Sequence, residues 1–369
     1  MSMKLGLYIH IPFCQSKCLY CDFYSERRSE DFMDLYTEKM CKSIAFWGKK
    51  AEERIVDTIY FGGGTPSIIG TERILKILDA VSDSFILDNP EVTIEMNPSS
   101  LIKVDLLKLC ERGFNRLSIG LQSAVNSELA LLGRKHRSGD ALKTVELAKQ
   151  CGFSNISLDI MLGIPYQTMA SLASTLEFII KCGVQHISCY MLKLEQGTPL
   201  YKNRSRYRLC SEDEYCDFYE YTEKKLKDCG FTHYEISNFC LDGFESRHNT
   251  KYWRLGEYIG IGSSAHSFFE GKRFFYPLSF EDFFEGRICP DGIGGDPEEF
   301  VMLALRLKDG LRFDDFKKKY GFSVPNAVLK KALFFENQGM MNVSEKAFSL
   351  TEKGFLLSNE IIVQLLEEF

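Results

Sequence analysis

Short runs of aliphatic and β-branched residues alternate with longer amphipathic stretches through the first two thirds of the chain. The short runs predict β-strands at residues 5–11, 55–61, 92–95, 116–119, 156–160 and 186–190. The amphipathic stretches predict helices at 31–46, 72–81, 101–112, 140–151, 168–181 and 212–229. Three of these helices end at a glycine (Gly113, Gly152 and Gly230), which suits the left-handed residue after a helix. The series predicts an α/β fold with a parallel sheet, because each parallel strand pair needs a crossover helix.

This order of elements fits either an open doubly wound sheet or a full or partial barrel. We favour the barrel, because the residues with chemical potential fall at or just after predicted strand ends, where barrel sites are built. The pattern changes after residue 285: residues 289–300 predict a loop, and helices at 298–308, 313–320 and 325–338, a short hairpin and a final helix follow. We therefore expect a barrel at residues 1–285 and a small, mainly helical C-terminal domain at 286–369.

Composition and charge narrow the class of protein. The 369 residues carry 51 acidic and 45 basic side chains, a formal net charge of −6, which argues against nucleic-acid binding. No stretch of about 18 uncharged apolar residues occurs, so we expect no membrane-spanning helix, although peripheral membrane contact stays open. The N-terminal residues lack a small-residue cleavage site, and we expect a cytoplasmic protein.

Three of the thirteen cysteines stand apart from the rest. Ten are scattered singly, and we expect them to be small buried hydrophobes. Cys14, Cys18 and Cys21 instead form the spacing C-x3-C-x2-C. Thiolates this close can hold one soft metal centre, either zinc or an iron–sulfur cluster, and three of them leave one coordination position open. His10 is the alternative fourth ligand, which would close a structural zinc site.

The cysteine spacing, with Tyr20 inside its last interval, resembles the cluster motif of radical S-adenosylmethionine (SAM) enzymes. Further stretches resemble that family in the same order: YIHIPFC from Tyr8, GGGTPS from Gly62, EMNP from Glu95, GLQS from Gly120 and DIMLGIP from Asp159. Together they are similar to the oxygen-independent coproporphyrinogen III oxidase family and, within it, to a heme-chaperone branch. The resemblance covers nearly the whole chain and implies a partial (β/α)6 barrel.

The resemblance implies a cofactor role for each of these motifs. Cys14, Cys18 and Cys21 would hold a [4Fe–4S] cluster whose fourth iron is chelated by SAM. The residues that match SAM contacts of the family are Tyr8, Tyr20, Gly63, Gly64, Thr65, Glu95, Gln122, Arg134 and Asp159. The residues alone leave plainer roles open: turn glycines, salt bridges inside the barrel for the two carboxylates, a solvated helix arginine and a core tyrosine.

A later stretch, RHNTKYW, resembles a motif that the chaperone branch associates with heme. The resemblance implies that heme, as cargo, is handled by His248, Asn249, Tyr252 and Trp253. Physically, histidine is a good iron ligand, and tyrosine and tryptophan offer flat surfaces for a porphyrin. A histidine among aromatic residues is also commonly a packing residue. His266 is a second candidate ligand, which we expect to lie in a loop.

Two departures from the oxidase branch direct the functional prediction. The oxidases carry a further cysteine two residues after the third, where this chain has Phe23, and a longer segment before the motif tyrosine. Both departures favour a heme chaperone whose partners are heme-accepting proteins, with a homodimer left open. The alternative is a coproporphyrinogen III oxidase that uses a 5′-deoxyadenosyl radical for oxidative decarboxylation. A zinc-stabilised binding protein is the third interpretation.

Overall fold

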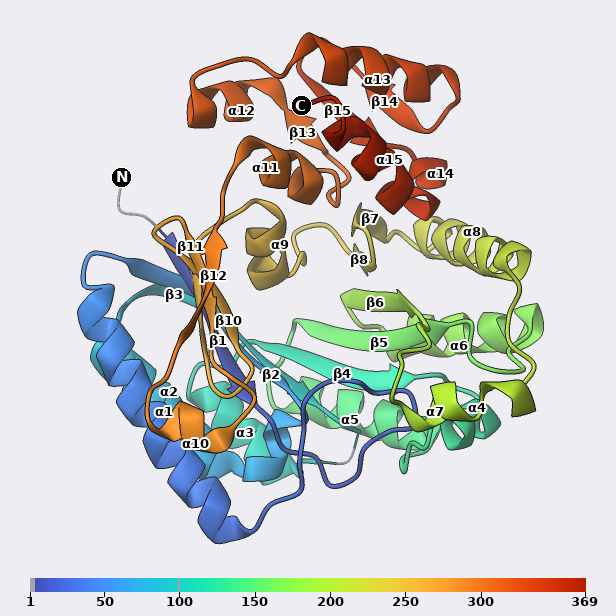
Figure 1. The fold of residues 1–369 in the computed structure, drawn as a ribbon. Coiled ribbons are helices and arrows are strands. Elements are labelled where there is room, and N and C mark those ends of the chain that lie inside the picture. Colours follow the sequence, from blue (N-terminus) through green and yellow to red (C-terminus); the bar gives the residue numbers. More distant parts are fainter. Residues whose placement is uncertain (1–3, 99) are drawn as a thin grey trace.

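The computed structural model describes residues 4–98 and 100–369, and these residues form a curved sheet. Its twelve strands within the described part of the chain lie in the order β12-β11-β10-β9-β1-β2-β3-β4-β5-β6-β8-β7. Strands β1 to β6 run parallel, with bounds Lys4–Ile11, Ile55–Gly63, Ile86–Met96, Arg116–Gln122, Ile156–Leu162 and His186–Met191. All six predicted strands are confirmed, and the sheet curves into a partial barrel that stays open (Figure 1).

Helices cover the outside of this sheet (Figure 1). They are α1 (Glu30–Lys50), α2 (Thr71–Ser84), α3 (Lys103–Glu111), α4 (Asn126–Leu131), α5 (Ser138–Gln150), α6 (Met169–Cys182) and α8 (Glu212–Asp228). The short elements η1 (Pro66–Ile69), α7 (Pro199–Lys202) and η2 (Arg204–Arg206) lie in connecting loops. The predicted glycine ends are confirmed, since φ is +99° at Gly113, +101° at Gly152 and +87° at Gly230.

Alternation along the strands separates an apolar outer face from a polar inner face. On β1, Leu7 and Ile9 are fully buried in the core, and the residues between them point to the other face. The parallel register places Tyr8 beside Tyr60. The inside of the barrel is therefore lined by hydroxyl, carboxylate and imidazole groups, which need partners from neighbouring strands or from a ligand.

After α8 the chain returns to both edges of the barrel. Strands β7 (Thr232–Glu235) and β8 (Asn238–Cys240) form a hairpin whose strand β8 runs antiparallel to β6. Helix α9 (Arg247–Trp253) follows, and β9 (Tyr258–Ile261) pairs in parallel with β1. The chain thus crosses from one edge of the parallel sheet to the other through α9.

Three further strands extend the edge at β9. They are β10 (His266–Phe269), β11 (Lys272–Phe275) and β12 (Cys289–Ile293), with helix α10 (Phe280–Phe284) between the last two. The predicted loop at 289–300 is wrong over its first five residues, because β12 pairs antiparallel with β11 and places Cys289 opposite Phe275. His266, expected in a loop, opens β10, where its exposed ring stacks on Phe275.

The last part of the chain forms a separate helical layer above the barrel in Figure 1. Its helices are α11 (Pro297–Ala304), α12 (Phe313–Tyr320), α13 (Asn326–Asn337), α14 (Glu352–Leu356) and α15 (Ser358–Leu366). A small sheet joins β13 (Leu311–Arg312), β15 (Ala347–Leu350) and β14 (Met341–Val343) in that order. Because β12 belongs to the main sheet, we propose that the two units divide between β12 and α11. No helix within residues 4–98 and 100–369 is long and apolar enough to cross a membrane.

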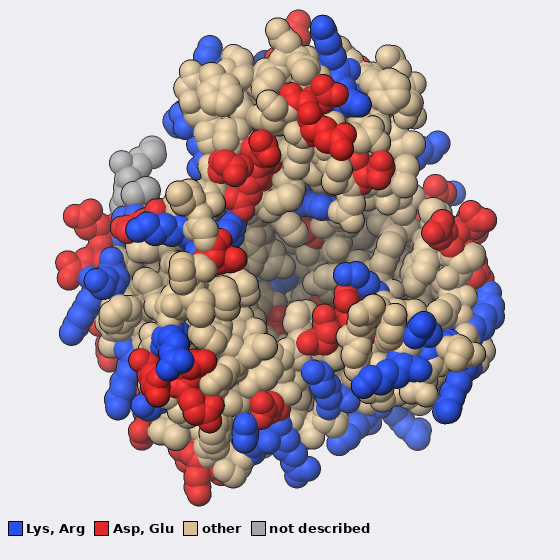
Figure 2. Space-filling model, in the orientation of Figure 1, with Lys and Arg blue, Asp and Glu red and all other residues tan. Residues whose placement is uncertain are grey.

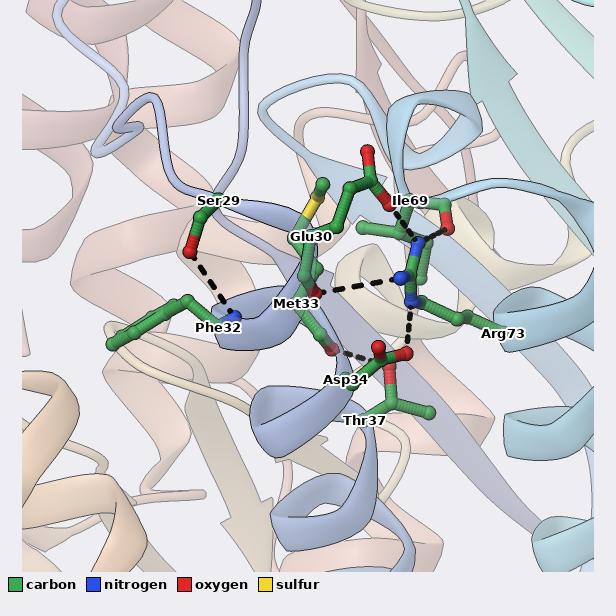
Figure 3. A network of polar contacts seen from close by, with 8 residues as sticks. All are labelled: Ser29, Glu30, Phe32, Met33, Asp34, Thr37, Ile69 and Arg73. Atoms are coloured by element: carbon green, nitrogen blue, oxygen red, sulfur yellow. Dashed lines mark hydrogen bonds and ion pairs between the residues drawn. The ribbon is translucent and has the colours of Figure 1, made fainter.

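Helix α1 begins where the cysteine loop (residues 12–29) ends, and Arg73 ties its first turns to α2 and η1 (Figure 3). Arg73 Nε donates to Asp34 Oδ1 at 2.6 Å. Its Nη1 donates to Glu30 Oε2 at 2.7 Å and to the Ile69 carbonyl at 2.8 Å. Ser29 Oγ caps the helix by accepting a backbone N–H. The end of the cysteine loop is therefore held against the segment that follows β2.

Candidate functional site

A cavity of about 420 Å³ lies at the carboxyl ends of the parallel strands and is lined by the cysteine loop. Its walls include these predicted residues: Cys14, Cys18, Cys21, Tyr20, Gly63, Gly64, Thr65, Glu95, Gln122, Arg134 and Asp159. A space of this size suits a small-molecule cofactor. Residues that are far apart in the sequence thus converge on one site, as the barrel prediction requires. Figure 2 shows the molecule hollowed at the centre of the barrel, below the C-terminal unit.

The turn after β2 brings the backbone close to the cysteine loop. The Gly64 N–H donates to the Ile11 carbonyl at 2.9 Å, and the Thr65 N–H donates to the Phe13 carbonyl at 2.8 Å. A Cβ at Gly64 would stand 2.5 Å from the Phe13 carbonyl oxygen, so only glycine fits here. Gly63 has φ +115°, which also favours glycine. Both glycines line the cavity, and their lack of side chains lets this turn pack closely against His10 and Phe13.

The three predicted cluster thiols share this cavity. Cys14 Sγ lies 3.5 Å from Thr65 Oγ1, and Cys18 Sγ accepts from Arg134 Nη1 at 3.5 Å. Burial raises the pKa of Cys21, and the neighbouring Cys18 and Cys14 raise it further. In the part of the chain that the structure describes, no three His, Cys, Asp or Glu side chains already stand at metal-ligand spacing. The donor set of three thiols on one loop nevertheless suits an iron–sulfur centre.

Arg134 joins the cysteine loop to the strand ends. Besides its contact with Cys18, its Nη2 donates to Asn97 Oδ1 at 2.6 Å and to the Gly120 carbonyl at 2.5 Å. Asn97 Nδ2 in turn donates to Thr65 Oγ1 at 3.0 Å. The guanidinium is therefore a built part of the cavity wall and not a solvated helix residue.

Glu95 presents a carboxylate to the cavity from the end of β3. Its Oε1 accepts from the Tyr60 hydroxyl at 2.8 Å, and its Oε2 accepts from the Gly63 N–H at 3.2 Å. Burial raises the pKa of Glu95 to about 7, and the charge of Asp159 also raises it. Among the described residues no lysine or arginine pairs with this carboxylate, so a cationic ligand group such as an ammonium would be favoured beside it.

Asp159 and Gln122 complete the floor of the cavity. The Ser118 hydroxyl lies 3.1 Å and 3.2 Å from the two carboxylate oxygens of Asp159, whose pKa is raised by burial. Gln122 has φ +71° and is buried, and within the described residues its Oε1 has no hydrogen-bond partner. A buried amide oxygen without a partner is costly unless a ligand donates to it. The protein thus leaves one hydrogen-bond acceptor of this polar cavity without a donor among the described residues.

Tyr8 and His10 lie on β1 behind the cavity and do not line it. The Tyr8 hydroxyl lies 3.0 Å from His10 Nδ1, and burial raises the pKa of Tyr8. Burial lowers the pKa of His10 to about 4. The contact of Tyr8 with SAM therefore stays a prediction, as does the alternative role of His10 as a fourth zinc ligand.

The predicted heme ligand His248 is enclosed in the barrel by α9. It is 1% exposed, and its backbone N–H donates to Glu91 Oε1 at 3.1 Å. Its Nδ1 lies 2.9 Å from Thr58 Oγ1, and its Nε2 lies 2.7 Å from the Tyr252 hydroxyl. Burial lowers the pKa of His248 to about 3. Both ring nitrogens of His248 thus contact hydroxyl groups in this structure, and its predicted contact with heme stays a prediction.

The other residues of the α9 motif also serve the closure of the barrel. Trp253 Nε1 donates to Glu235 Oε2 at 2.6 Å. The Tyr252 ring packs edge-on to Tyr258 on β9, with centroids 4.4 Å apart. The Asn249 N–H donates to Ser246 Oγ at the start of the helix. These contacts hold α9 against one end of the barrel. The sequence motif alone does not indicate this position.

Three residues of the site escaped sequence analysis. Asn97 stands inside the EMNP stretch, and its side chain binds both Thr65 and Arg134. Tyr60 and Ser118 hold the two carboxylates. The signal was present, because both alternate with apolar residues on strands and so face the inside of the barrel.

Comparison with known proteins agrees with this geometry. Residues 8–179 match the family model of the Radical SAM superfamily, and residues 296–357 match the HemN C-terminal domain. The chain is 33% identical to the heme chaperone HemW of Lactococcus lactis, with 97% of this chain and 96% of that protein covered. It is 32% identical to the heme chaperone HemW of Bacillus subtilis, with 98% and 99% covered. The chain belongs to the HemW family of radical SAM proteins.

Two further comparisons extend this result. The bovine radical S-adenosyl methionine domain-containing protein 1, mitochondrial, is 35% identical over 82% of this chain and 65% of its own length. The structure of coproporphyrinogen III oxidase (HemN) from Escherichia coli, a radical SAM enzyme, superposes with a TM-score of 0.86 over 100% of this chain and 91% of that chain. At 21% identity this second likeness shows the fold, and it confirms the expected partial barrel with its helical C-terminal unit.

Proposed function

We propose that this protein is a heme chaperone that holds a [4Fe–4S] cluster and SAM at the carboxyl ends of its parallel strands and delivers heme to acceptor hemoproteins. The observation that carries the proposal is one cavity shared by three cysteine thiols, a glycine turn and the carboxylates of Glu95 and Asp159. The full-length similarity to proteins named heme chaperones supports the heme part of it.

The residues of the cavity fit both cofactors. Cys14, Cys18 and Cys21 would hold the cluster, which when reduced supplies one electron to SAM. Glu95 would take the ammonium group of SAM, and the backbone of Gly63 and Gly64 would allow its close approach. The amide oxygen of Gln122, which has no partner among the described residues, supports a polar ligand beside it. The same ligand would contact Tyr20, Thr65, Arg134 and Asp159, which line the remaining walls.

The rest of the proposal concerns partners and location. Phe23 stands where the oxidases carry a further cysteine. We therefore propose heme transfer as the leading activity and coproporphyrinogen III oxidation as the alternative. We place the protein in the cytoplasm, with heme-accepting proteins as partners and a homodimer as an option for the chaperone. Tyr8, which does not line the cavity in this structure, is also proposed to contact SAM.

Heme transfer from the cluster-loaded protein tests this function. Protein purified without oxygen and containing about four iron and four sulfide per chain is loaded with hemin and mixed with apomyoglobin as the acceptor. We expect the Soret band of myoglobin to appear, and to appear more slowly for the triple variant Cys14→Ser, Cys18→Ser and Cys21→Ser. Cys216→Ser, which changes an exposed cysteine elsewhere, is the matched control.

A parallel assay decides between the two activities. The same preparation receives SAM, a reductant and coproporphyrinogen III, and the porphyrins are oxidised and separated by chromatography. Cysteine-dependent formation of protoporphyrin without heme transfer would make the protein an oxidase and overturn the proposal. Transfer of hemin without protoporphyrin formation supports the chaperone.

A further inference from the structure

A row of polar side chains leads from the cofactor cavity to the end of the barrel that α9 covers. Asp159 lines the cavity, and Ser157 stands two positions before it on β5, so both side chains lie on one face of the strand. Ser157 Oγ lies 3.4 Å from Asp159 Oδ1 and 2.8 Å from Nδ1 of His186, its register partner on β6. His186 Nε2 lies 2.8 Å from the Tyr234 hydroxyl on β7. Four side chains from three strands therefore form one hydrogen-bonded chain.

The middle of this chain is closed to solvent. Ser157 and His186 have no exposed surface, and Tyr234 is 8% exposed. Burial lowers the pKa of His186 well below its usual range, and the charge of the buried Arg116 lowers it further. The imidazole is therefore neutral at neutral pH and carries a single N–H. One of its nitrogens donates a hydrogen bond and the other accepts one.

The contacts of Tyr234 decide which nitrogen donates. The Tyr234 oxygen accepts the backbone N–H of Ser246, at the start of α9, at 3.1 Å. Within the described part of the chain, the acceptor that the Tyr234 proton reaches is His186 Nε2. A buried hydroxyl that fails to donate is costly, so Tyr234 donates to Nε2 and the proton of His186 lies on Nδ1. This N–H points to the Ser157 oxygen, and the Ser157 hydroxyl is left to donate onward.

Two acceptors stand within reach of the Ser157 proton. Ser188 Oγ lies at 3.3 Å and Asp159 Oδ1 at 3.4 Å. The carboxylate is the stronger acceptor, because hydrogen bonds to an ionised group are about twice as strong as neutral ones. Burial raises the pKa of this carboxyl, and hydrogen bonds from Ser188, Ser118 and Ser157 oppose that rise. The serines thus hold Asp159 in place of a fixed cation.

We propose that His186 is a positioning residue of the SAM site, whose Nδ1–H directs the Ser157 hydroxyl toward Asp159 and thereby keeps the carboxylate turned to the cavity. The inference rests on the proposed function and deepens it, because in that function Asp159 contacts SAM. His186 does not line the cavity, so it acts on the ligand only through Ser157 and Asp159. A carboxylate that is already oriented binds a ligand at a lower entropic cost than one that must first be ordered.

Two substitutions of His186 separate the roles of its two nitrogens. In His186→Asn the amide nitrogen can take the place of Nδ1 and donate to Ser157, whereas in His186→Gln the amide reaches the place of Nε2 and contacts only Tyr234. SAM affinity of the cluster-loaded protein is measured by calorimetry. We expect His186→Gln to weaken SAM binding about fivefold, the equivalent of one hydrogen bond, and His186→Asn to stay within about twofold of the unchanged protein.

Ser157→Ala tests whether the effect of the histidine passes through this hydroxyl. Alone it should also weaken SAM binding about fivefold, and adding His186→Gln to it should cause no further loss. The control is His233→Leu, which changes another buried histidine, on β7, outside this chain of contacts. It should leave SAM affinity unchanged, and iron content and thermal melts show that each variant is folded and loaded.

The position of the proton on His186 can be observed without any ligand. Nitrogen NMR of the cluster-loaded protein with ¹⁵N-labelled histidine distinguishes the two tautomers, and the signals of His186 are those missing from His186→Asn. We expect a protonated Nδ1 and a bare Nε2 between about pH 6 and 8. A proton on Nε2 would reverse the direction of the chain and overturn the inference.

The outcomes separate this inference from the proposed function. If the unchanged protein binds SAM, and His186→Gln and Ser157→Ala bind it equally well, His186 does not position the site and the inference fails alone. If the unchanged protein with its cluster binds no SAM, the proposed function fails and the inference fails with it. Weakened binding in His186→Gln, restored binding in His186→Asn and a proton on Nδ1 together support the inference.

Discussion

The two ends of the barrel carry similar polar side chains and use them in different ways. Toward the amino ends of the strands, Glu91 accepts the backbone N–H groups of Arg247 and His248 at 3.1 Å each. Helix α9 thereby closes that end. At the carboxyl ends, Glu95 and Gln122 face an open cavity, and the amide oxygen of Gln122 has no partner within the described residues.

The difference lies in pairing and not in residue type. A buried polar group that finds its partners inside the fold stabilises the fold, whereas one that lacks a partner and also lines a cavity, such as Gln122, can be completed by a ligand. By this criterion His248 belongs to the closed end, although its sequence motif predicts a heme ligand. The criterion also explains why the site residues cluster at the open end, where the strands of a barrel present their carboxyl termini.

The largest effect is expected at the closed end. Glu91→Ala removes the acceptor of two backbone N–H groups and leaves the buried Arg116 without its neighbouring carboxylate. We expect a loss of about 3–4 kcal/mol in the free energy of unfolding, measured with urea, and an unchanged SAM affinity in the folded protein. Glu111→Ala, an exposed glutamate of α3, is the control. If Glu91→Ala lowered the free energy of SAM binding as much as the free energy of unfolding, the two ends of the barrel would not act independently.

At the open end, Gly64→Ala should damage both stability and cofactor binding. Its new Cβ would lie 2.5 Å from the Phe13 carbonyl oxygen and 3.0 Å from the Phe13 nitrogen, and backbone atoms cannot easily move away. We expect a loss of about 2–3 kcal/mol together with a loss of bound iron, measured by urea unfolding and iron analysis. The control Gly139→Ala in α5 meets no atom within 4 Å and should stabilise the protein by up to about 1 kcal/mol. Equal behaviour of the two variants would contradict the close approach.

The raised pKa of Glu95, about 7, gives a pH dependence with a defined sign. The folded protein holds this proton more tightly than the unfolded chain, whose glutamate has a pKa near 4.3. Cofactor-free protein should therefore lose stability as the pH rises from about 4.5 to 7, with no further loss from this group above that range. Glu95→Gln should remove that loss and gain about 2 kcal/mol at pH 8 with no gain at pH 4, measured by thermal melts.

Glu235 supplies the matched control at the closed end. Burial raises the pKa of Glu235 to about 7 as well, so Glu235→Gln should show a similar gain in stability at pH 8. Only Glu95→Gln should also weaken SAM binding. If both variants bound SAM normally, Glu95 would not face the ligand as proposed.

The smallest effect concerns the outer support of the site. Arg73 bonds to Glu30 and Asp34, whose side chains are 74% and 62% exposed, and such pairs contribute little in water. Arg73→Met should lower the free energy of unfolding by about 0.5–1 kcal/mol without changing the iron content. A variant that lost iron would show that the support of α1 also shapes the cysteine loop.

The parallel strands of the fold could be predicted from the sequence, whereas the strands at the edge of the sheet could not. The six parallel strands follow from alternation and from helices of the right length between them. Strand β12 contains Pro290 and Gly292, residues that favour a loop, and forms only because β11 lies beside it. The local sequence pattern cannot show that a neighbouring strand will be placed beside a segment by the tertiary fold.

The site divides in the same way. Glu95 and Asp159 could be predicted because each is an isolated carboxylate in an apolar strand. The role of His248 could not, because its partner Thr58 lies 190 positions away in the sequence. Sequence analysis did not single out the exposed residues Tyr190 and Met191. The pattern of a strand does not show whether its carboxyl end is covered or open to solvent.

The position of β1 has a consequence for synthesis of the chain. This strand leads into the cysteine loop and is flanked by β2 on one side and β9 on the other. Residues 64–257 are translated between those two neighbours, an interval of about 10–40 s at ordinary ribosomal rates. During that time the nascent chain exposes an unpaired edge of β1, the kind of edge that attracts other strands. The cysteine loop is made before β2, yet the strands on both sides of β1 are complete only once residue 261 has been made.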